Sequence, residues 1–215
     1  MDGTGGSSSQ ACIAITPDGD TLPGEVRRPA GTPRGAATLC HPHPDYGGDR
    51  FNIVIEALFA ALPAAGFAAA RFDFRRPVLT GDTGRGVRAE LDVGAMLDAT
   101  AAAIPGVPLA LAGYSFGAAV GLAAAGSRDD VTAIAAIAPP AAMLALDALP
   151  TVPTLIVVPA HDQFGPPGTI GPLVAGWPEA TVVTVESADH FLAGRTALVA
   201  RHVVDWFDRH LPPVL

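Results

Sequence analysis

Gly113-Tyr114-Ser115-Phe116-Gly117 is the segment of this sequence whose residue types and spacing point most directly to chemistry. A serine on a sharp turn from a strand into a helix has its hydroxyl held clear of the surrounding backbone. The flanking sequence predicts such a turn, since 107–112 is a short apolar run and 118–125 is a small-residue helix that Gly126 can end. The flanking glycines remove side chains that would clash there. The pattern therefore predicts that Ser115 is a nucleophile.

A serine hydroxyl is a weak nucleophile until a base takes its proton, and two later loops could supply that base and its partner. His190 lies between the last predicted strand and the last predicted helix, and Asp162 directly follows a predicted strand. Both, like Ser115, are expected at the carboxyl ends of strands, where parallel sheets bind ligands. The chain order Ser115, Asp162, His190 is typical of α/β-hydrolases. In that arrangement serine attacks, histidine is general base and then general acid, and aspartate fixes the imidazole tautomer.

Other aspartates compete for the role of the acid. Asp147 follows the sixth predicted strand and is the second candidate. Asp189 adjoins His190 in the chain, which leaves it badly placed to orient that ring. Asp129 and Asp130 follow the serine's helix, so we expect them at the opposite edge of the sheet.

A second chemically suggestive segment is Cys40–Gly48, which follows a strand expected beside the nucleophile strand. Such a loop can present a backbone N–H to a developing oxyanion, with the N–H of Phe116 as the other donor. The prolines of the segment have no N–H. Three candidates for the loop donor remain, with Asp45 preferred over His43 and Tyr46.

The two histidines of this segment also raise the question of metal binding. His41 and His43 are two residues apart and have no acidic ligand cluster near them in the sequence, so we predict no metal site and no cofactor. We expect His41 to pack under the loop and to form hydrogen bonds with it. Cys40 ends a buried strand, and a packing role is expected for it.

The rest of the chain supplies the elements that must position these residues. Apolar runs alternate with helix-like segments, which predicts an α/β fold with a mostly parallel sheet covered on both faces. The first two strands are expected to form an antiparallel pair. Strands are predicted at 12–16, 25–28, 36–40, 67–74, 107–112, 131–138, 154–159 and 180–185. Helices are predicted at 50–64, 88–103, 118–125, 168–176 and 195–210, with a short helix or turn at 141–146 and a loop at 75–87.

Composition limits the classes of function. The 215 residues suffice for one domain, expected over 11–215 after a disordered tail at 1–10. The net charge of −8 and the lack of a basic stripe argue against nucleic-acid binding. All 13 basic residues are arginine, which excludes lysine Schiff-base chemistry. No apolar run reaches about 18 residues and the start lacks a signal-peptide pattern, so we expect no membrane association and a cytoplasmic location.

These motifs resemble those of a known family. Cys40–Gly48, followed by Asn52, resembles the "CHPHP-x-x-GG…N" signature of small bacterial α/β-hydrolases of the dienelactone-hydrolase and carboxylesterase-like type. Leu111–Ala118 is similar to their "LAGYSFGA" elbow, and Arg71–Arg75 is similar to their "RFNFRG" strand. The resemblance covers about residues 35–210.

The resemblance implies an α/β-hydrolase fold and a serine hydrolase that cleaves carboxylic esters. It implies the same triad of Ser115, Asp162 and His190, with an oxyanion hole on Phe116 and the His43–Tyr46 loop. The sequence departs from the family after Arg75, where the family often has glycine. Arg75 and Arg76 could meet an anionic substrate group, but pairing with Asp73 or Asp82 is the commoner outcome for such arginines.

The expected substrate follows from the length of one connection. Residues 139–153, between the sixth and seventh predicted strands, are too few for a helical cap, so no large cap domain is expected and an open cleft would suit short acyl esters. A thioesterase or a serine aminopeptidase-like hydrolase remains the alternative, and a non-catalytic binding protein a more distant one. A small-molecule ester is the expected partner, and monomer and homodimer both remain open. The predicted pocket walls are His43, Tyr46, Met143, Phe164 and Phe191. Phe116 and Leu144 are further candidates, for which packing in the core is the competing account.

Overall fold

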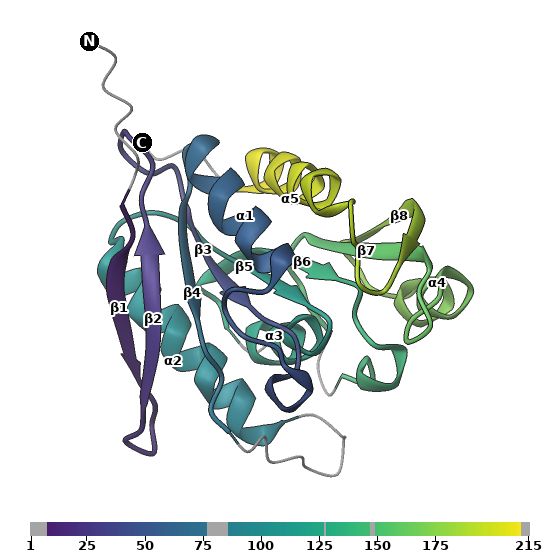
Figure 1. The fold of residues 1–215 in the computed structure, drawn as a ribbon, viewed down its shortest axis with the longest axis horizontal. Coiled ribbons are helices and arrows are strands. Elements are labelled where there is room, and N and C mark those ends of the chain that lie inside the picture. The colour runs from purple at the N-terminus through teal and green to yellow at the C-terminus, as the bar shows by residue number, and fades with distance from the viewer. Residues whose placement is uncertain (1–7, 77–85, 127, 147–148, 212–215) are drawn as a thin grey trace.

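The computed structural model describes residues 8–76, 86–126, 128–146 and 149–211 (Figure 1). Most of the expected disordered tail, residues 1–7, lies outside the described residues, whereas Gln10 already begins the first strand. The strands are β1 (Gln10–Ile15), β2 (Thr21–Arg27), β3 (Ala36–Cys40), β4 (Ala68–Phe72), β5 (Leu109–Tyr114), β6 (Val131–Ile137), β7 (Thr154–His161) and β8 (Ala180–Asp189). The helices are α1 (Ile53–Ala64), α2 (Val87–Ala103), α3 (Phe116–Ala125), α4 (Pro167–Val174) and α5 (Thr196–His210), with 3-10 turns η1 (Pro44–Tyr46) and η2 (Ala141–Met143).

The described strands form one sheet in the order β1-β2-β4-β3-β5-β6-β7-β8. β1 and β2 are an antiparallel pair, as predicted, and β2 is also antiparallel to β4. All pairings from β4 through β8 are parallel. β3 pairs with β5, so the segment after Cys40 lies beside the turn at Ser115, as the sequence predicts.

Helices cover both faces of the sheet (Figure 1). One core contains the buried side chains of α1 and α5, among them Leu58, Val203 and Phe207. The other contains those of α2, α3 and α4, such as Met96 and Val120. β3, β4 and β5 are buried along their whole length, as expected for parallel strands covered on both sides. The predicted α/β class is confirmed, and no large cap domain is found in the described chain.

The sheet places the predicted triad residues together, at the carboxyl ends of its parallel strands. Ser115 directly follows β5, Asp162 follows β7, and His190 follows β8. Because these strands are parallel, their carboxyl ends share the same edge. β7 and β8 run further than predicted because their ladder continues to the pair His161↔Asp189. That extension carries the acid and the base forward together. Among the described residues, no helix is both long and apolar enough to cross a membrane.

Candidate active site

The turn at Ser115 has the strained geometry that its sequence predicts. Ser115 has φ 55° and ψ −118°, a backbone conformation that non-glycine residues seldom adopt, and its N–H donates to the carbonyl oxygen of Ile137 at 2.8 Å. A Cβ on Gly113 would lie 2.3 Å from the Gly117 carbonyl oxygen. A Cβ on Gly117 would lie 2.3 Å from the Cys40 carbonyl oxygen. Gly113 therefore lets β5 turn tightly into α3, and Gly117 lets the elbow pack against the end of β3.

The structure brings together the three residues predicted to form a triad. Ser115 Oγ lies 2.9 Å from His190 Nε2, and His190 Nδ1 lies 2.8 Å from Asp162 Oδ2 and 3.0 Å from Oδ1. Asp162 and His190 are 2% and 5% exposed, so their contact is shielded from solvent. A carboxylate on Nδ1 stabilises the tautomer with hydrogen on Nδ1, which leaves Nε2 free to accept the serine proton.

Backbone and side-chain hydrogen bonds fix this arrangement. Asp162 Oδ1 also accepts the N–H groups of Phe164, at 2.7 Å, and Gly165, at 3.1 Å. The Tyr114 hydroxyl donates to the His190 carbonyl oxygen at 2.8 Å, and burial raises the pKa of this phenol, so it stays a donor. The residue before the nucleophile thus anchors the backbone of the base. This role of Tyr114 was not anticipated from the sequence, although its place in G-x-S-x-G could have suggested it.

The rival acids occupy other positions. Asp189 is exposed, and its carboxylate accepts the N–H of Phe191 at 3.0 Å. Asp130 pairs with Arg128. Asp147, the second candidate, lies outside the described residues.

The loop after β3 is held from beneath by His41, as the sequence predicts. His41 Nδ1 donates to the Pro42 carbonyl oxygen at 2.6 Å, and Nε2 accepts the N–H of Phe74 at 3.0 Å. The side chain is 1% exposed, and burial lowers its pKa to about 4. Cys40 is fully buried and free, in agreement with its predicted packing role. Within the described residues, no three His, Cys, Asp or Glu side chains gather to hold a metal.

Two of the three candidate oxyanion donors in the loop donate to acceptors within the loop. The N–H of Asp45 donates to His43 Nδ1 at 3.1 Å, so the preferred donor is already used inside the loop, and Asp45 does not line the cavity. The N–H of Tyr46 donates to the His43 carbonyl oxygen at 3.1 Å. Among the described residues, no acceptor is found for the N–H of His43. The N–H of Phe116 begins α3 and has no intrahelical acceptor.

A cavity of about 610 Å³ opens at Ser115 and His190. Five residues predicted as pocket walls line it: His43, Tyr46, Met143, Phe164 and Phe191. Leu144 does not line it and packs in the core instead. Phe116 lines it as well, and its ring packs edge-on to His43 at 4.6 Å between centroids. Asn52 and Pro140 also line the cavity, which the sequence did not predict. Their positions, at the start of α1 and after β6, place both at the carboxyl edge.

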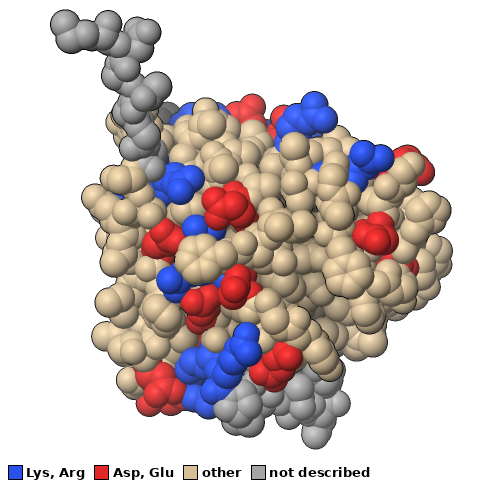
Figure 2. Space-filling model, in the orientation of Figure 1, with Lys and Arg blue, Asp and Glu red and all other residues tan. Residues whose placement is uncertain are grey.

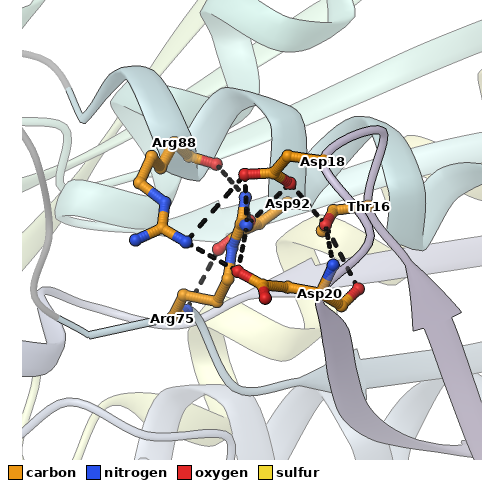
Figure 3. A network of polar contacts seen from close by, with 6 residues as sticks. All are labelled: Thr16, Asp18, Asp20, Arg75, Arg88 and Asp92. Atoms are coloured by element: carbon orange, nitrogen blue, oxygen red, sulfur yellow. Dashed lines mark hydrogen bonds and ion pairs between the residues drawn. The ribbon is translucent and has the colours of Figure 1, made fainter.

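The arginines after β4 do not face the cavity. Arg75 contacts Asp18, Asp20 and Asp92 at 2.6–2.8 Å, where the sequence predicted Asp73 or Asp82 (Figure 3). Asp82 lies outside the described residues. Asp73 pairs with Arg50 instead, at 2.7 Å.

The Arg75 network belongs to a wider pattern of paired charge. Arg76 Nη2 lies 3.4 Å from the Gly48 carbonyl oxygen, and Arg71 pairs with Glu25 and Glu56. Figure 2 shows the corresponding interleaving of blue and red atoms on the left half of the view, where β1, β2 and β4 lie. The carboxylates around Arg75 and Arg71 therefore occupy both guanidinium groups, whereas Arg76 is exposed and contacts only the Gly48 carbonyl oxygen among the described residues.

Comparison with known proteins identifies the fold. No family model matches the chain, and no curated protein matches it. Among solved structures, an α/β serine hydrolase without a lid from Xanthomonas campestris has a TM-score of 0.83 at 27% identity, covering 98% of this chain and 98% of that one. An α/β serine hydrolase homologue from Coxiella burnetii has a TM-score of 0.79 at 26% identity, covering 91% of this chain and 96% of that one.

A more distant neighbour agrees with these. Dienelactone hydrolase from Anabaena variabilis has a TM-score of 0.80 at 20% identity, covering 95% of this chain and 99% of that one, a likeness of fold alone. The chain is similar to each of these proteins over nearly its whole length. Together with the sheet order, these likenesses show that the chain has the α/β-hydrolase fold.

Proposed function

We propose that this protein is a serine hydrolase that cleaves short-chain carboxylic esters through an acyl-enzyme on Ser115. One observation carries the proposal: Ser115 Oγ, His190 and Asp162 form a continuous hydrogen-bonded series of 2.9 Å and 2.8 Å at the mouth of an open cavity. Packing of the hydrophobic core does not require a serine, a histidine and an aspartate from three different strand ends to form this series. The serine hydrolases among the structural neighbours support the same chemistry.

In the first half of the reaction, Ser115 Oγ attacks the ester carbonyl carbon while its proton passes to His190 Nε2. The tetrahedral intermediate collapses, the bond to the alcohol oxygen breaks, and His190 returns the proton to that oxygen. In the second half, water attacks the acyl carbon and gives a proton to His190. The bond between that carbon and Ser115 Oγ then breaks, His190 returns the proton to Oγ, and the carboxylic acid leaves. Asp162 stays ionised throughout and stabilises the imidazolium.

We propose that the oxyanion is bound by the N–H groups of Phe116 and His43. Phe116 is the first residue of α3, whose N-terminus also favours negative charge. His43 lines the cavity, and its N–H is the remaining donor of the three loop candidates. Removing a single oxyanion donor from a serine hydrolase costs on the order of 100-fold or more in kcat, so this pair supplies a large share of the rate.

Hydrolysis of p-nitrophenyl acetate, butyrate and octanoate by the wild type and Ser115→Ala tests the proposal. We expect turnover that falls with chain length and is lost in Ser115→Ala, together with labelling by a fluorophosphonate probe that peptide mapping assigns to Ser115. Loss of labelling with retained turnover would contradict an acyl-enzyme. If Ser115 is labelled but no ester is cleaved, thioester and peptide substrates should be tested, because the same groups can act on them.

A further inference from the structure

Two exposed phenylalanines flank the base. The side chains of Phe164 and Phe191 are 53% and 59% exposed, yet both line the cavity. Their ring centroids lie 4.7 Å and 5.8 Å from that of His190, both in edge-on contact. Large apolar side chains gathered at the mouth of a cavity mark a binding surface, because water is readily displaced from them by an apolar partner.

The backbone at both rings is held by the loops of the triad. The N–H of Phe164 donates to the catalytic carboxylate of Asp162, at 2.7 Å. Phe191 directly follows His190 in the chain, and its N–H donates to the side chain of Asp189, on the other side of His190, at 3.0 Å. The backbone of Phe164 is therefore fixed by a hydrogen bond to the acid itself, and that of Phe191 is fixed next to the base in the chain. A group bound against them is oriented relative to Nε2.

The proton transfer from His190 determines which half of an ester lies against Phe164 and Phe191. His190 must return a proton to the departing alcohol oxygen, so that oxygen lies within hydrogen-bond reach of Nε2 when the bond breaks. The alcohol group attached to it extends past the imidazole ring. Three side chains that line the cavity pack on that ring, the buried Tyr114 and the exposed Phe164 and Phe191. The alcohol side of the substrate therefore meets aromatic surface, and Phe164 and Phe191 are its exposed part.

The same surroundings disfavour charge. None of the described lining residues is Asp, Glu, Lys or Arg. Arg75, which the sequence suggested for anion binding, lies between the carboxylates of Asp18, Asp20 and Asp92, and Arg88 approaches the first two (Figure 3). An ionised group held against Phe164 and Phe191 would lose hydration without gaining a charged partner among the lining residues.

We propose that Phe164 and Phe191 form an alcohol subsite that selects esters of uncharged aromatic alcohols. This inference rests on the proposed hydrolysis of short-chain acyl esters. It adds a preference for the alcohol that leaves and does not change the preference for a short acyl group. Edge-on and offset aromatic contacts give a planar ring more stabilisation than an alkyl group gains from area alone.

The experiment compares kcat/KM for benzyl acetate and ethyl acetate, which share the acyl group. We expect the wild type to prefer benzyl acetate at least tenfold, and Phe164→Ala and Phe191→Ala each to lower that ratio severalfold, with Phe→Leu at each position restoring only part. Both rates are measured on the same preparation, so their ratio does not depend on the fraction of enzyme that is folded. A variant that is partly unfolded can therefore still be compared with the wild type. We also expect 4-carboxybenzyl acetate to react at least tenfold more slowly than benzyl acetate.

Leu173→Ala is the matched control, since Leu173 is 47% exposed on α4 and does not line the cavity. Its ratio should equal that of the wild type. A ratio unchanged in both alanine variants, or equal rates for the charged and uncharged benzyl esters, would overturn the subsite while leaving Ser115-dependent hydrolysis intact. Absence of Ser115-dependent turnover of every ester would overturn the proposed function, and the subsite with it.

Discussion

His41 Nε2 accepts the N–H of Phe74 at 3.0 Å, which joins the end of β3 to the segment after β4 through one buried imidazole. The other ring nitrogen donates to the Pro42 carbonyl oxygen, so both nitrogens are used and the ring must be neutral. A protonated ring carries hydrogen on Nε2 and cannot accept. The loop that holds the candidate oxyanion donor is therefore stable only while His41 is uncharged.

The first prediction concerns pH and stability. The folded-state pKa of His41 is lowered from 6.5 to about 4 by burial, so the unfolded chain binds a proton more readily. The stabilisation is complete above pH 6.5 and is lost as pH falls toward 4. The difference corresponds to roughly 3 kcal/mol. Urea unfolding between pH 7.5 and 4.5 should show this decline in the wild type and a much smaller one in His41→Gln. The same slope in both proteins would mean that other groups cause it.

The second prediction concerns the acid. Asp162→Asn keeps an oxygen to accept the N–H groups of Phe164 and Gly165, but places an amide donor toward His190 and favours the wrong imidazole tautomer. We expect kcat to fall by about 10⁴ with an unchanged circular dichroism spectrum. The control is Asp189→Asn, next to the base in sequence but exposed, which should stay within a few fold of wild type. Near-normal turnover in Asp162→Asn, with loss in Asp147→Asn, would move the acid to Asp147.

The third prediction tests whether Arg75 stabilises the fold or binds substrate. Its partner Asp92 is 1% exposed, so Arg75→Ala leaves a buried carboxylate without its ion pair and should lower the free energy of unfolding by about 3 kcal/mol. Arg34→Ala, which removes an ion pair with Asp208 whose side chains are half exposed, should cost under about 1 kcal/mol. The kcat/KM for neutral esters should change little in either folded variant. A large loss of kcat/KM at full stability would indicate instead that Arg75 binds substrate.

The fourth prediction concerns the elbow glycine. In Gly117→Ala the new methyl group would lie 2.3 Å and 2.4 Å from the carbonyl oxygens of Cys40 and His41, which are backbone atoms that cannot move alone. We expect a loss of several kcal/mol or failure to fold, as for other overpacked sites. Gly168→Ala, at the start of α4, meets nothing within 4 Å and should be neutral or slightly stabilising. Thermal unfolding of both proteins distinguishes these outcomes, and a stable, active Gly117→Ala would show that the elbow can shift.

The sequence predicted those features that depend on local pattern. The alternation of apolar runs and helical segments predicted the sheet, and the G-x-S-x-G turn predicted the elbow. Strand ends were less accurate, since β7 and β8 extend by mutual pairing that neither segment reveals alone. The loop donor could not be chosen from the sequence because the choice depends on hydrogen bonds inside the loop, where His43 Nδ1 accepts the N–H of Asp45. The partners of Arg75 were missed because Asp18 and Asp20 lie 57 and 55 residues away in the chain.

Because three separate strands end at the triad, the activity depends on contacts between distant parts of the chain. Ser115 and His190 are 75 residues apart, and Asp162 and His190 are 28 apart. No piece of the chain shorter than residues 115–190 contains all three. The parallel strands that carry these residues pair only after long connecting segments have closed. During refolding from denaturant, helical signal should therefore return before esterase activity. The catalytic rate would then report the completion of folding rather than its beginning.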